Sequence, residues 1–277
     1  MKRELLVPLI TYPEASSDAV APNAVAVARH LGADLHALDI NVDIPDVSSA
    51  LSGRLLKLPE KIRQTETASR ARGQALLAVM KETASRAGVS LTTREIAAPP
   101  ARFGEVAAAN ARYYDLSLIG WEAGNQAGRM TAEAMVFESG RSVVLLPDTA
   151  SIDRIDHVVI AWDGSRAAAR AVADAHPFLE RASEITVVTV LGEKSIREKD
   201  ADRLTRELQK RGYPATSDAI PAEDCAISVT LQEHALEIGG QLLVMGGYGH
   251  SRIRNFVLGG ATKGILSDLR LPVLLSH

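Results

Sequence analysis

The sequence predicts an α/β protein made of two tandem doubly wound domains, each with a five-stranded parallel sheet. Short apolar runs alternate with segments of helical spacing, the same order of strands and helices occurs twice, and a polar stretch, Asp148–Asp153, separates the two copies. Strands that alternate with helices pair in parallel through right-handed crossovers. One large α/β domain, the alternative, does not account for the repeat or the linker. We therefore expect domains at 1–148 and 152–277.

The first half reads as five strands and four helices. Its helices show apolar positions at helical spacing. The first helix ends at Gly32 and the second at Gly88. The segment 43–59 has no clear period and reads as a leucine-containing insertion. The expected strands are 5–10, 33–42, 90–96, 115–119 and 142–146, and the expected helices are 19–31, 60–87, 104–112 and 131–139.

The second half repeats this order. Residues 242–246 correspond to 116–120, and residues 271–276 correspond to 141–146. Ser195 and Glu198 have the spacing of a capping box, which predicts a helix start. The expected strands are 157–161, 185–190, a short strand ending at 220, 241–245 and 272–275, and the expected helices are 165–179, 195–212, 226–238 and 261–270.

The bulk composition excludes several classes of protein. A formal net charge of -3 leaves no basic surface for duplex nucleic acid, and 4% aromatic residues argue against a stacking platform for single strands. The single cysteine, Cys225, forms no internal disulfide. The apolar run Leu5–Ile10 is too short for a signal-peptide core or a membrane span. We expect a cytoplasmic protein without nucleic-acid or membrane partners.

A glycine-rich loop follows the apolar strand near 241–245. Gly246 and Gly249 are expected to supply positive φ and to let a ligand approach the backbone without a Cβ in the way. Gly259 and Gly260 precede the expected helix 261–270, whose N-terminus favours an anion. The alternative is that these glycines only punctuate turns. The whole stretch predicts a phosphate site at the carboxyl end of a sheet strand.

The spacing Gly246-x2-Gly249-x9-Gly259, followed by a small residue, resembles the nucleotide-binding signature of the universal stress protein family. The resemblance covers nearly the whole chain and is to the tandem, Rossmann-like type. It implies ATP, with or without Mg²⁺, as the ligand, and it implies that subunits pair through their fifth strands. The family usually has Ser or Thr where this chain has Gly260. The implied adenine and ribose contacts are Asp163 and Val190, and the implied phosphate contacts are Gly246, Gly249, Gly259, Gly260 and Ala261, with Thr262 nearby.

The predicted topology places these residues together. Ligands of open α/β sheets bind beyond the carboxyl ends of the strands, where the strand order reverses. Asp163 follows the first strand of the second half, and Val190 ends the next one. Asp163 could accept a hydrogen bond from a ribose or an adenine amine. As an alternative, it is an N-cap or turn residue in Asp163-Gly164-Ser165.

The first half has the pattern of a degenerate copy. Ile10 stands where the second half has Asp163, so the carboxylate is missing. Gly120 and Gly124 remain, but Arg129-Met130 replaces the second glycine pair. We expect the bulk of these two side chains to close the anion site.

Three functions fit the sequence to different degrees. The first is an ATP-binding stress-response regulator that is not an enzyme, and the second is a nucleotide-free adaptor that acts through protein contacts. The third, ranked below both, is an ATP-dependent ligase or nucleotidyl transferase, but residues 161–165 do not match the Ser-Gly-Gly-x-Asp loop of such enzymes. The sequence has no P-loop and no His or Cys spacing typical of a metal site.

Both copies of the fifth strand are apolar edges that proteins avoid exposing, so we expect 142–146 and 272–275 to lie adjacent and antiparallel.

The insertion 43–59 generates a testable prediction. Its leucines need cover, and long loops in compact domains are often lids or interfaces. We expect this segment to contact the other half or a second chain, giving a homo-oligomer. Sedimentation at micromolar concentration checks this expectation, and a monomer in which this segment is disordered counts against it.

Overall fold

The computed structural model describes residues 2–45, 58–191, 198–222, 226–247 and 264–277. The chain divides into a first unit, Met1–Ser139, and a second unit, Gly140–His277.

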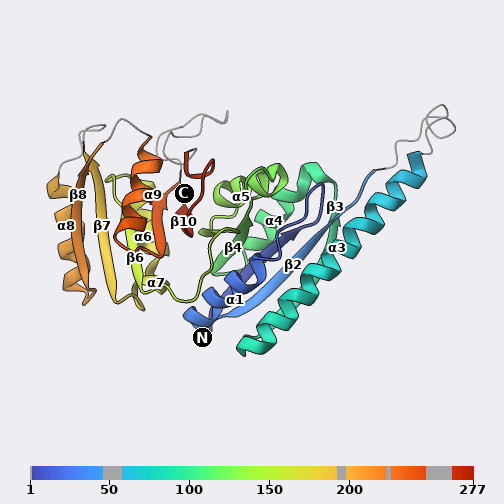
Figure 1. Cartoon of the computed structure of the whole chain (residues 1–277), viewed down its shortest axis with the longest axis horizontal. Helices are drawn as coiled ribbons and strands as arrows, with labels where there is room; N and C mark the ends of the chain where they lie inside the picture. The colour runs from blue at the N-terminus through green and yellow to red at the C-terminus, as the bar shows by residue number, and fades with distance from the viewer. Residues whose placement is uncertain (1, 46–57, 192–197, 223–225, 248–263) are drawn as a thin grey trace. The chain divides into compact units, whose positions relative to one another are not determined.

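The first unit contains four parallel strands in the order β3-β2-β1-β4 (Figure 1). Their apolar residues are buried, as expected for a sheet covered on both faces. Helix α1 packs beside α3, and α4 packs beside α5. The elements are β1 (Glu4–Ile10), α1 (Val20–Leu31), β2 (Asp34–Val42), α3 (Leu58–Ala87), β3 (Leu91–Ala98), η1 (Pro100–Arg102), α4 (Phe103–Ala111), β4 (Leu116–Trp121) and α5 (Gln126–Glu138).

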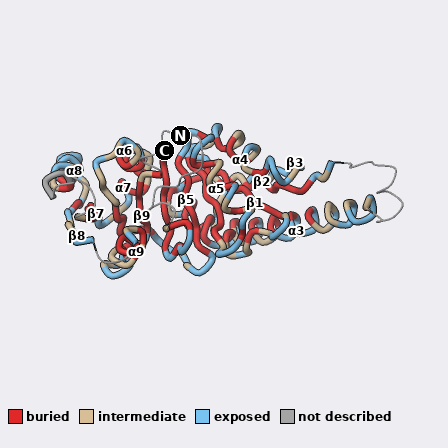
Figure 2. The backbone as a smooth tube through the Cα atoms, turned by 90° about the horizontal axis from the view of Figure 1, so that it is seen from above, coloured by how far each residue is buried: buried red, intermediate tan, exposed pale blue. Residues whose placement is uncertain are grey.

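The second unit contains a five-stranded parallel sheet, as predicted, in the order β10-β9-β6-β7-β8. Helices α6 and α9 lie on opposite faces of this sheet (Figure 2). The elements are β5 (Val143–Pro147), β6 (His157–Ala161), α6 (Arg166–Asp174), α7 (His176–Leu179), β7 (Glu184–Leu191), α8 (Glu198–Lys210), β8 (Ala215–Pro221), α9 (Ile227–Glu237), β9 (Leu242–Gly246) and β10 (Val273–Ser276). Together the two units have the predicted tandem doubly wound α/β fold.

The predicted antiparallel pairing of the fifth strands is confirmed. β10 pairs with β5 in antiparallel register, with Leu274 opposite Val144 and Val273 opposite Leu145. Both strands are buried along their length. Although β5 is the last strand of the first sequence repeat, it belongs to the second unit. The domain limits 1–148 and 152–277 stay a prediction.

Three helices differ from their predicted extents. α5 begins at Gln126 rather than 131, because the Asn125 side chain accepts the Gly128 N–H at 2.8 Å and caps an earlier turn. The expected helix 165–179 is two helices, and the second has Pro177 in its first turn, where no backbone donor is needed.

The third difference concerns the expected helix 261–270, whose beginning lies outside the described residues. Its described part leaves helical geometry after Ile265. The buried Gln232 side chain of α9 donates to the Asp268 carbonyl at 2.7 Å and accepts the Arg270 N–H at 2.9 Å. These two bonds satisfy backbone groups that would otherwise need helical partners.

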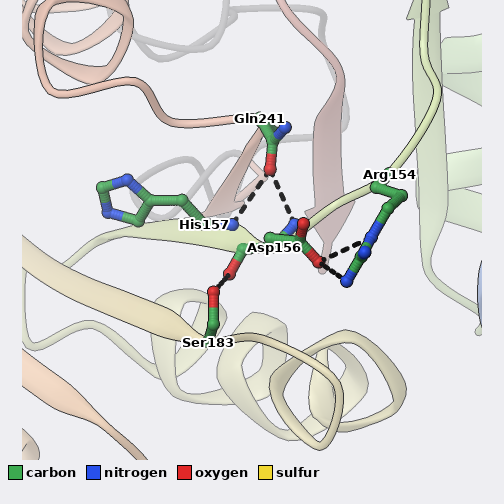
Figure 3. Close-up of polar contacts among 5 residues, drawn as sticks. All are labelled: Arg154, Asp156, His157, Ser183 and Gln241. Carbon is green, nitrogen blue, oxygen red and sulfur yellow. Dashed lines mark hydrogen bonds and ion pairs between the residues drawn. The ribbon is translucent and has the colours of Figure 1, made fainter.

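The side chain of Gln241 joins the amino ends of β6 and β9 through hydrogen bonds (Figure 3). Gln241 Oε1 accepts the backbone N–H groups of Asp156 at 2.6 Å and His157 at 3.1 Å. The Gln241 N–H in turn donates to the His157 carbonyl at 2.9 Å. These bonds fix the register of the two strands at the edge opposite their carboxyl ends.

Among the helices of the described residues, none has the length and apolar character needed to cross a bilayer.

The pairing of β5 with β10 predicts a large cost for Leu274→Ala. Leu274 is 0% exposed, so the substitution leaves a cavity and should lower the free energy of unfolding by about 2–5 kcal/mol. Leu236→Ala is the control, because Leu236 is 43% exposed and its truncation should change stability by about 0.5 kcal/mol or less. Chemical denaturation of the full chain measures both, and equal losses would contradict the prediction.

Candidate functional site

The strand order of the second unit reverses between β6 and β9. The chain passes from β6 to β7 and β8 on one side and then returns to β9 and β10 on the other. In such sheets the crevice for a ligand lies beyond the carboxyl ends of the two strands at the reversal. Here those ends carry Asp163, just after β6, and Gly246, the last residue of β9.

Asp163 serves the local turn. Its Oδ1 accepts the Ser165 N–H at 2.9 Å, and Gly164 between them has a φ of 70°. Ser165 then caps α6, since its hydroxyl accepts the Ala168 N–H at 3.1 Å. The turn alternative raised by the sequence is therefore present in the structure. A carboxylate has about four acceptor sites, so the turn and a ligand contact are compatible.

Val190 lies on β7 close to this turn. β6 and β7 are in register with Ala161 opposite Val188. The contact continues past the end of β6, because the Trp162 N–H donates to the Val188 carbonyl at 2.8 Å and the Thr189 hydroxyl donates to the Trp162 carbonyl at 3.0 Å. The same register extended to the next residues brings Asp163 and Val190 to neighbouring positions. Val190 is 8% exposed.

Gly246 has a different role from the one expected. It does not have a positive φ, so the expectation of a left-handed backbone there is wrong. A Cβ on Gly246 would lie 2.5 Å from the Ala168 nitrogen and 2.8 Å from the Ala167 Cβ. Glycine is needed because the end of β9 packs directly against the first turn of α6. The next residue, Gly247, donates its N–H to the Ser276 carbonyl at 2.7 Å.

The remaining candidate residues cannot be placed in this crevice. Gly249, Gly259, Gly260, Ala261 and Thr262 lie outside the described residues. Within the described residues, no group of three or more His, Cys, Asp or Glu side chains is arranged to hold a metal ion.

The first unit permits an internal comparison. Leu5 pairs with Leu116 as Val158 pairs with Leu242, so counting along both strands places Ile10 at the position of Asp163. Ile10 is 1% exposed and belongs to the core. The same count places the buried Trp121 at the position of Gly247.

The first unit has a carboxylate of its own just after β4, which the sequence analysis missed. Glu122 Oε1 accepts the Ser17 N–H at 2.7 Å, and its Oε2 accepts the Asn125 side-chain N–H at 3.1 Å. Glu122 therefore ties the loop after β1 to the loop after β4. An acidic residue directly after the apolar run 116–121 was the sequence signal for it.

The expectation that Arg129 and Met130 close the anion site stays a prediction. Both lie inside α5, beyond its first turn. Arg129 pairs with Glu133 at 3.0 Å, and Met130 is 56% exposed. In the first unit the loops are joined by Glu122.

Comparison with known proteins supports the fold. No protein-family model matches the chain. No curated protein matches it either. A universal stress protein from Archaeoglobus fulgidus DSM 4304 matches with a TM-score of 0.71 at 16% identity, covering 99% of this chain and 96% of that one.

Two structures from Pseudomonas aeruginosa also match over the full length. A putative universal stress protein from strain UCBPP-PA14 has a TM-score of 0.60 at 15% identity, with 99% of this chain and 93% of that chain covered. A functionally unknown protein from strain PAO1 has a TM-score of 0.60 at 14% identity, with 99% and 92% covered. The chain thus resembles tandem universal stress proteins in its fold.

The packing of Gly246 predicts that Gly246→Ala destabilises the protein without any ligand present. Its Cβ would press on the backbone of α6, which cannot rotate away, and overpacking of this kind costs about 1–3 kcal/mol. Gly120→Ala, at the matching place in the first unit, is the control. There the nearest atoms are side-chain atoms of Glu122 and Val20, at 3.1 and 3.2 Å, so the loss should be smaller. Denaturation in nucleotide-free buffer measures the stability of both variants. If Gly246→Ala is as stable as the wild type, the role assigned to Gly246 is contradicted.

Proposed function

We propose that the protein binds an adenine nucleotide, ATP with or without Mg²⁺, in domain 152–277 and acts as a cytoplasmic regulator of the universal stress protein type. Nucleotide occupancy is then the signal that the protein transmits. The observation that supports this most is the convergence of Asp163, the first turn of α6 and Gly246 at the reversal of the strand order. Gly246 also begins the glycine-rich stretch that runs to Thr262.

In this proposal the base and ribose lie near Asp163 and Val190. Asp163 supplies a carboxylate acceptor whose orientation is already fixed by the Ser165 N–H. Val190 presents its main chain and a largely buried apolar side chain beside it. A preoriented acceptor binds a hydroxyl or amine with little further loss of conformational entropy.

The phosphates are assigned to backbone amides in the loop between Gly249 and Thr262. Glycines at Gly249, Gly259 and Gly260 leave those amides accessible, and Ala261 adds only a methyl group. Because Gly260 lacks the hydroxyl that the family usually has there, Gly260→Ser should tighten binding.

The first domain, 1–148, is proposed to bind no nucleotide, so each chain binds one. Ile10 removes the carboxylate acceptor, and Glu122 places a negative charge where phosphates would come. A carboxylate at hydrogen-bonding distance from the loop amide of Ser17 disfavours a second anion there. This arrangement supports a regulatory or structural role for the first copy.

Calorimetry with ATP tests the proposal through Gly249→Val. A β-branched residue is poorly tolerated at positive φ and would crowd the phosphates, so we expect no measurable binding. Gly124→Val is the matched control, since Gly124 has a φ of 89° and lies in the first unit. It introduces backbone strain outside the proposed site and should leave ATP binding intact. Unchanged binding in Gly249→Val would contradict the proposed site, and no binding to the wild type would leave the adaptor alternative.

Two substitutions of Asp163 separate its turn role from its ligand role. Asp163→Ala removes both and should weaken ATP binding by about 1–3 kcal/mol. Asp163→Asn keeps an oxygen for the Ser165 N–H but places an N–H₂ group where the second carboxylate oxygen was. If Asp163 accepts a hydrogen bond from the ligand, both variants lose affinity. If only the turn matters, Asp163→Asn binds like the wild type.

Two measurements test this function: identification of the nucleotide released from the purified protein, and incubation of the protein with ATP, which separates a regulator from an enzyme. We expect the released nucleotide to be an adenine nucleotide in a ratio of about one per chain. Sustained turnover of added ATP by the wild type, lost in Gly249→Val, would favour the ATP-dependent enzyme instead.

A further inference from the structure

A buried polar cluster lies in the first unit between β2 and α3, whereas the residues assigned to nucleotide binding belong to the second unit. Its members, Thr11, Asp39, Asn41 and Ser69, are between 0% and 3% exposed. The Thr11 and Ser69 hydroxyls lie 2.6 Å apart, and the Thr11 hydroxyl donates to the Ile40 carbonyl at 2.9 Å. Ser69 also accepts the Val42 N–H at 2.9 Å and donates to Asn41 Oδ1 at 3.3 Å. Ser69 is part of α3, so the cluster joins this helix to the sheet.

Asp39 is the member whose hydrogen bonding is incomplete. Its Oδ2 accepts from Asn41 Nδ2 at 2.8 Å, whereas its Oδ1 is buried and has no hydrogen-bond partner among the residues that the structure describes. The carboxyl group lies directly against the backbone of α3. A Cβ on Gly73 would come within 2.4 Å of both carboxyl oxygens. A glycine in the middle of this helix is therefore what allows the two to meet.

No cation compensates this carboxyl group within the described residues. The guanidinium of Arg72, on α3, donates instead to the Thr11 carbonyl at 2.8 Å and the Pro13 carbonyl at 3.5 Å. On β3 the residue in register with Asp39 is Glu95, which adds negative charge. On β1 the residue in register is the apolar Leu9, and the buried residues of α1 are all uncharged. An ionised Asp39 would thus be a buried charge that has the Asn41 hydrogen bond but no cationic partner in the described part of the chain.

The second unit shows that the fold does not need an acid here. Leu35 pairs with Leu5 as Ile185 pairs with Val158, so Thr189 occupies the position of Asp39. Thr189 is equally buried, and its hydroxyl donates to the Trp162 carbonyl at 3.0 Å. A neutral side chain with its bond satisfied stands where the first unit has a carboxyl group.

We propose that Asp39 is a proton-dependent latch for α3. With the proton bound, the neutral carboxyl group lets α3 dock on β2. Loss of the proton places an uncompensated charge between β2 and the backbone at Gly73, and docking of the helix weakens.

The direction of the pH dependence follows from the physical chemistry of the site. Burial raises the pKa of Asp39 from 3.8 to about 6, the hydrogen bond from Asn41 lowers the pKa, and Glu95 raises it. The folded chain therefore holds this proton more tightly than the unfolded chain. The stability that the Asp39 proton contributes is fully present below about pH 4 and is lost between about pH 4 and 6. Above that range, Asp39 causes no further change in the free energy of unfolding. Across that interval, the unfolding equilibrium constant should rise about 100-fold.

Tryptophan fluorescence can follow the first unit alone. The chain has two tryptophans, and Trp121 is in the first unit. In a Trp162→Phe background, Trp121 reports denaturation of that unit between pH 4.5 and 7.5. We expect Asp39→Asn to lack the Asp39-dependent loss, so that its stability relative to the parent grows as pH rises. Asp34→Asn is the matched control, because Asp34 lies on the same strand but pairs with Lys2 at the surface.

If Asp39→Asn does not fold, Asp39→Thr gives the same comparison, because threonine is the residue at the matching position of the second unit, Thr189. Parallel pH profiles for the parent and the Asp39 variants would overturn the proposal.

Two further measurements use the wild-type full chain. A carbon-13 titration of the Asp39 carboxyl group should give a midpoint near pH 6, and a midpoint at or below pH 4 would overturn the latch. Amide exchange within residues 69–84, corrected for its intrinsic pH dependence, should be less protected at pH 7.5 than at pH 5. Equal protection at both values would show that α3 stays docked and would also overturn it.

Discussion

The second unit depends on the antiparallel pairing of β5 with β10. A parallel sheet ends in strands whose outer backbone groups need partners, and such edges recruit other chains when they are apolar and open. β10 is fully buried, with Val273 and Leu274 at 0% exposure, and β5 supplies its second neighbour. β10 in turn holds β9, whose last residue, Gly246, contacts α6 and begins the candidate phosphate loop. The position of Gly246 beside α6 thus depends on the pairing of β9 with β10 and of β10 with β5.

The two halves show how one topology accommodates different chemistry. Strand order and helix placement are shared, yet the residue after the first strand is a core isoleucine in one unit and a carboxylate in the other. The loop after the fourth strand carries Glu122 in one unit and a glycine pair in the other. Because the sheet and its crossovers set the fold, these loop positions can diverge while the architecture stays the same.

The strands, their alternation with helices along the chain and the tandem organisation could be predicted, because buried parallel strands appear as uninterrupted apolar runs. What could not be predicted depends on single long-range contacts. The end of the helix after Gly264 is determined by Gln232 on a different element, and the need for glycine at 246 comes from the backbone of α6. Asp39 stood within an apolar strand and Gly73 within a long helix, but only the structure shows that these two exceptions meet. The resemblance suggested Asp163 and Val190, and the register of β6 and β7 brings them near each other, whereas the loop from Gly249 to Thr262 lies outside the described residues.

The pairing of β5 with β10 also bears on how the chain folds. Leu145 can pair with Val273 only after the ribosome has synthesised all the strands and helices between them. This contact therefore closes one of the longest loops in the protein. Contacts of such high sequence separation lose the most chain entropy and form late, which slows folding relative to locally connected proteins. Until β10 arrives, the nascent chain carries β5 as an apolar strand without that neighbour. Its susceptibility to aggregation should therefore be greatest in this interval, and chaperones would have most to protect there.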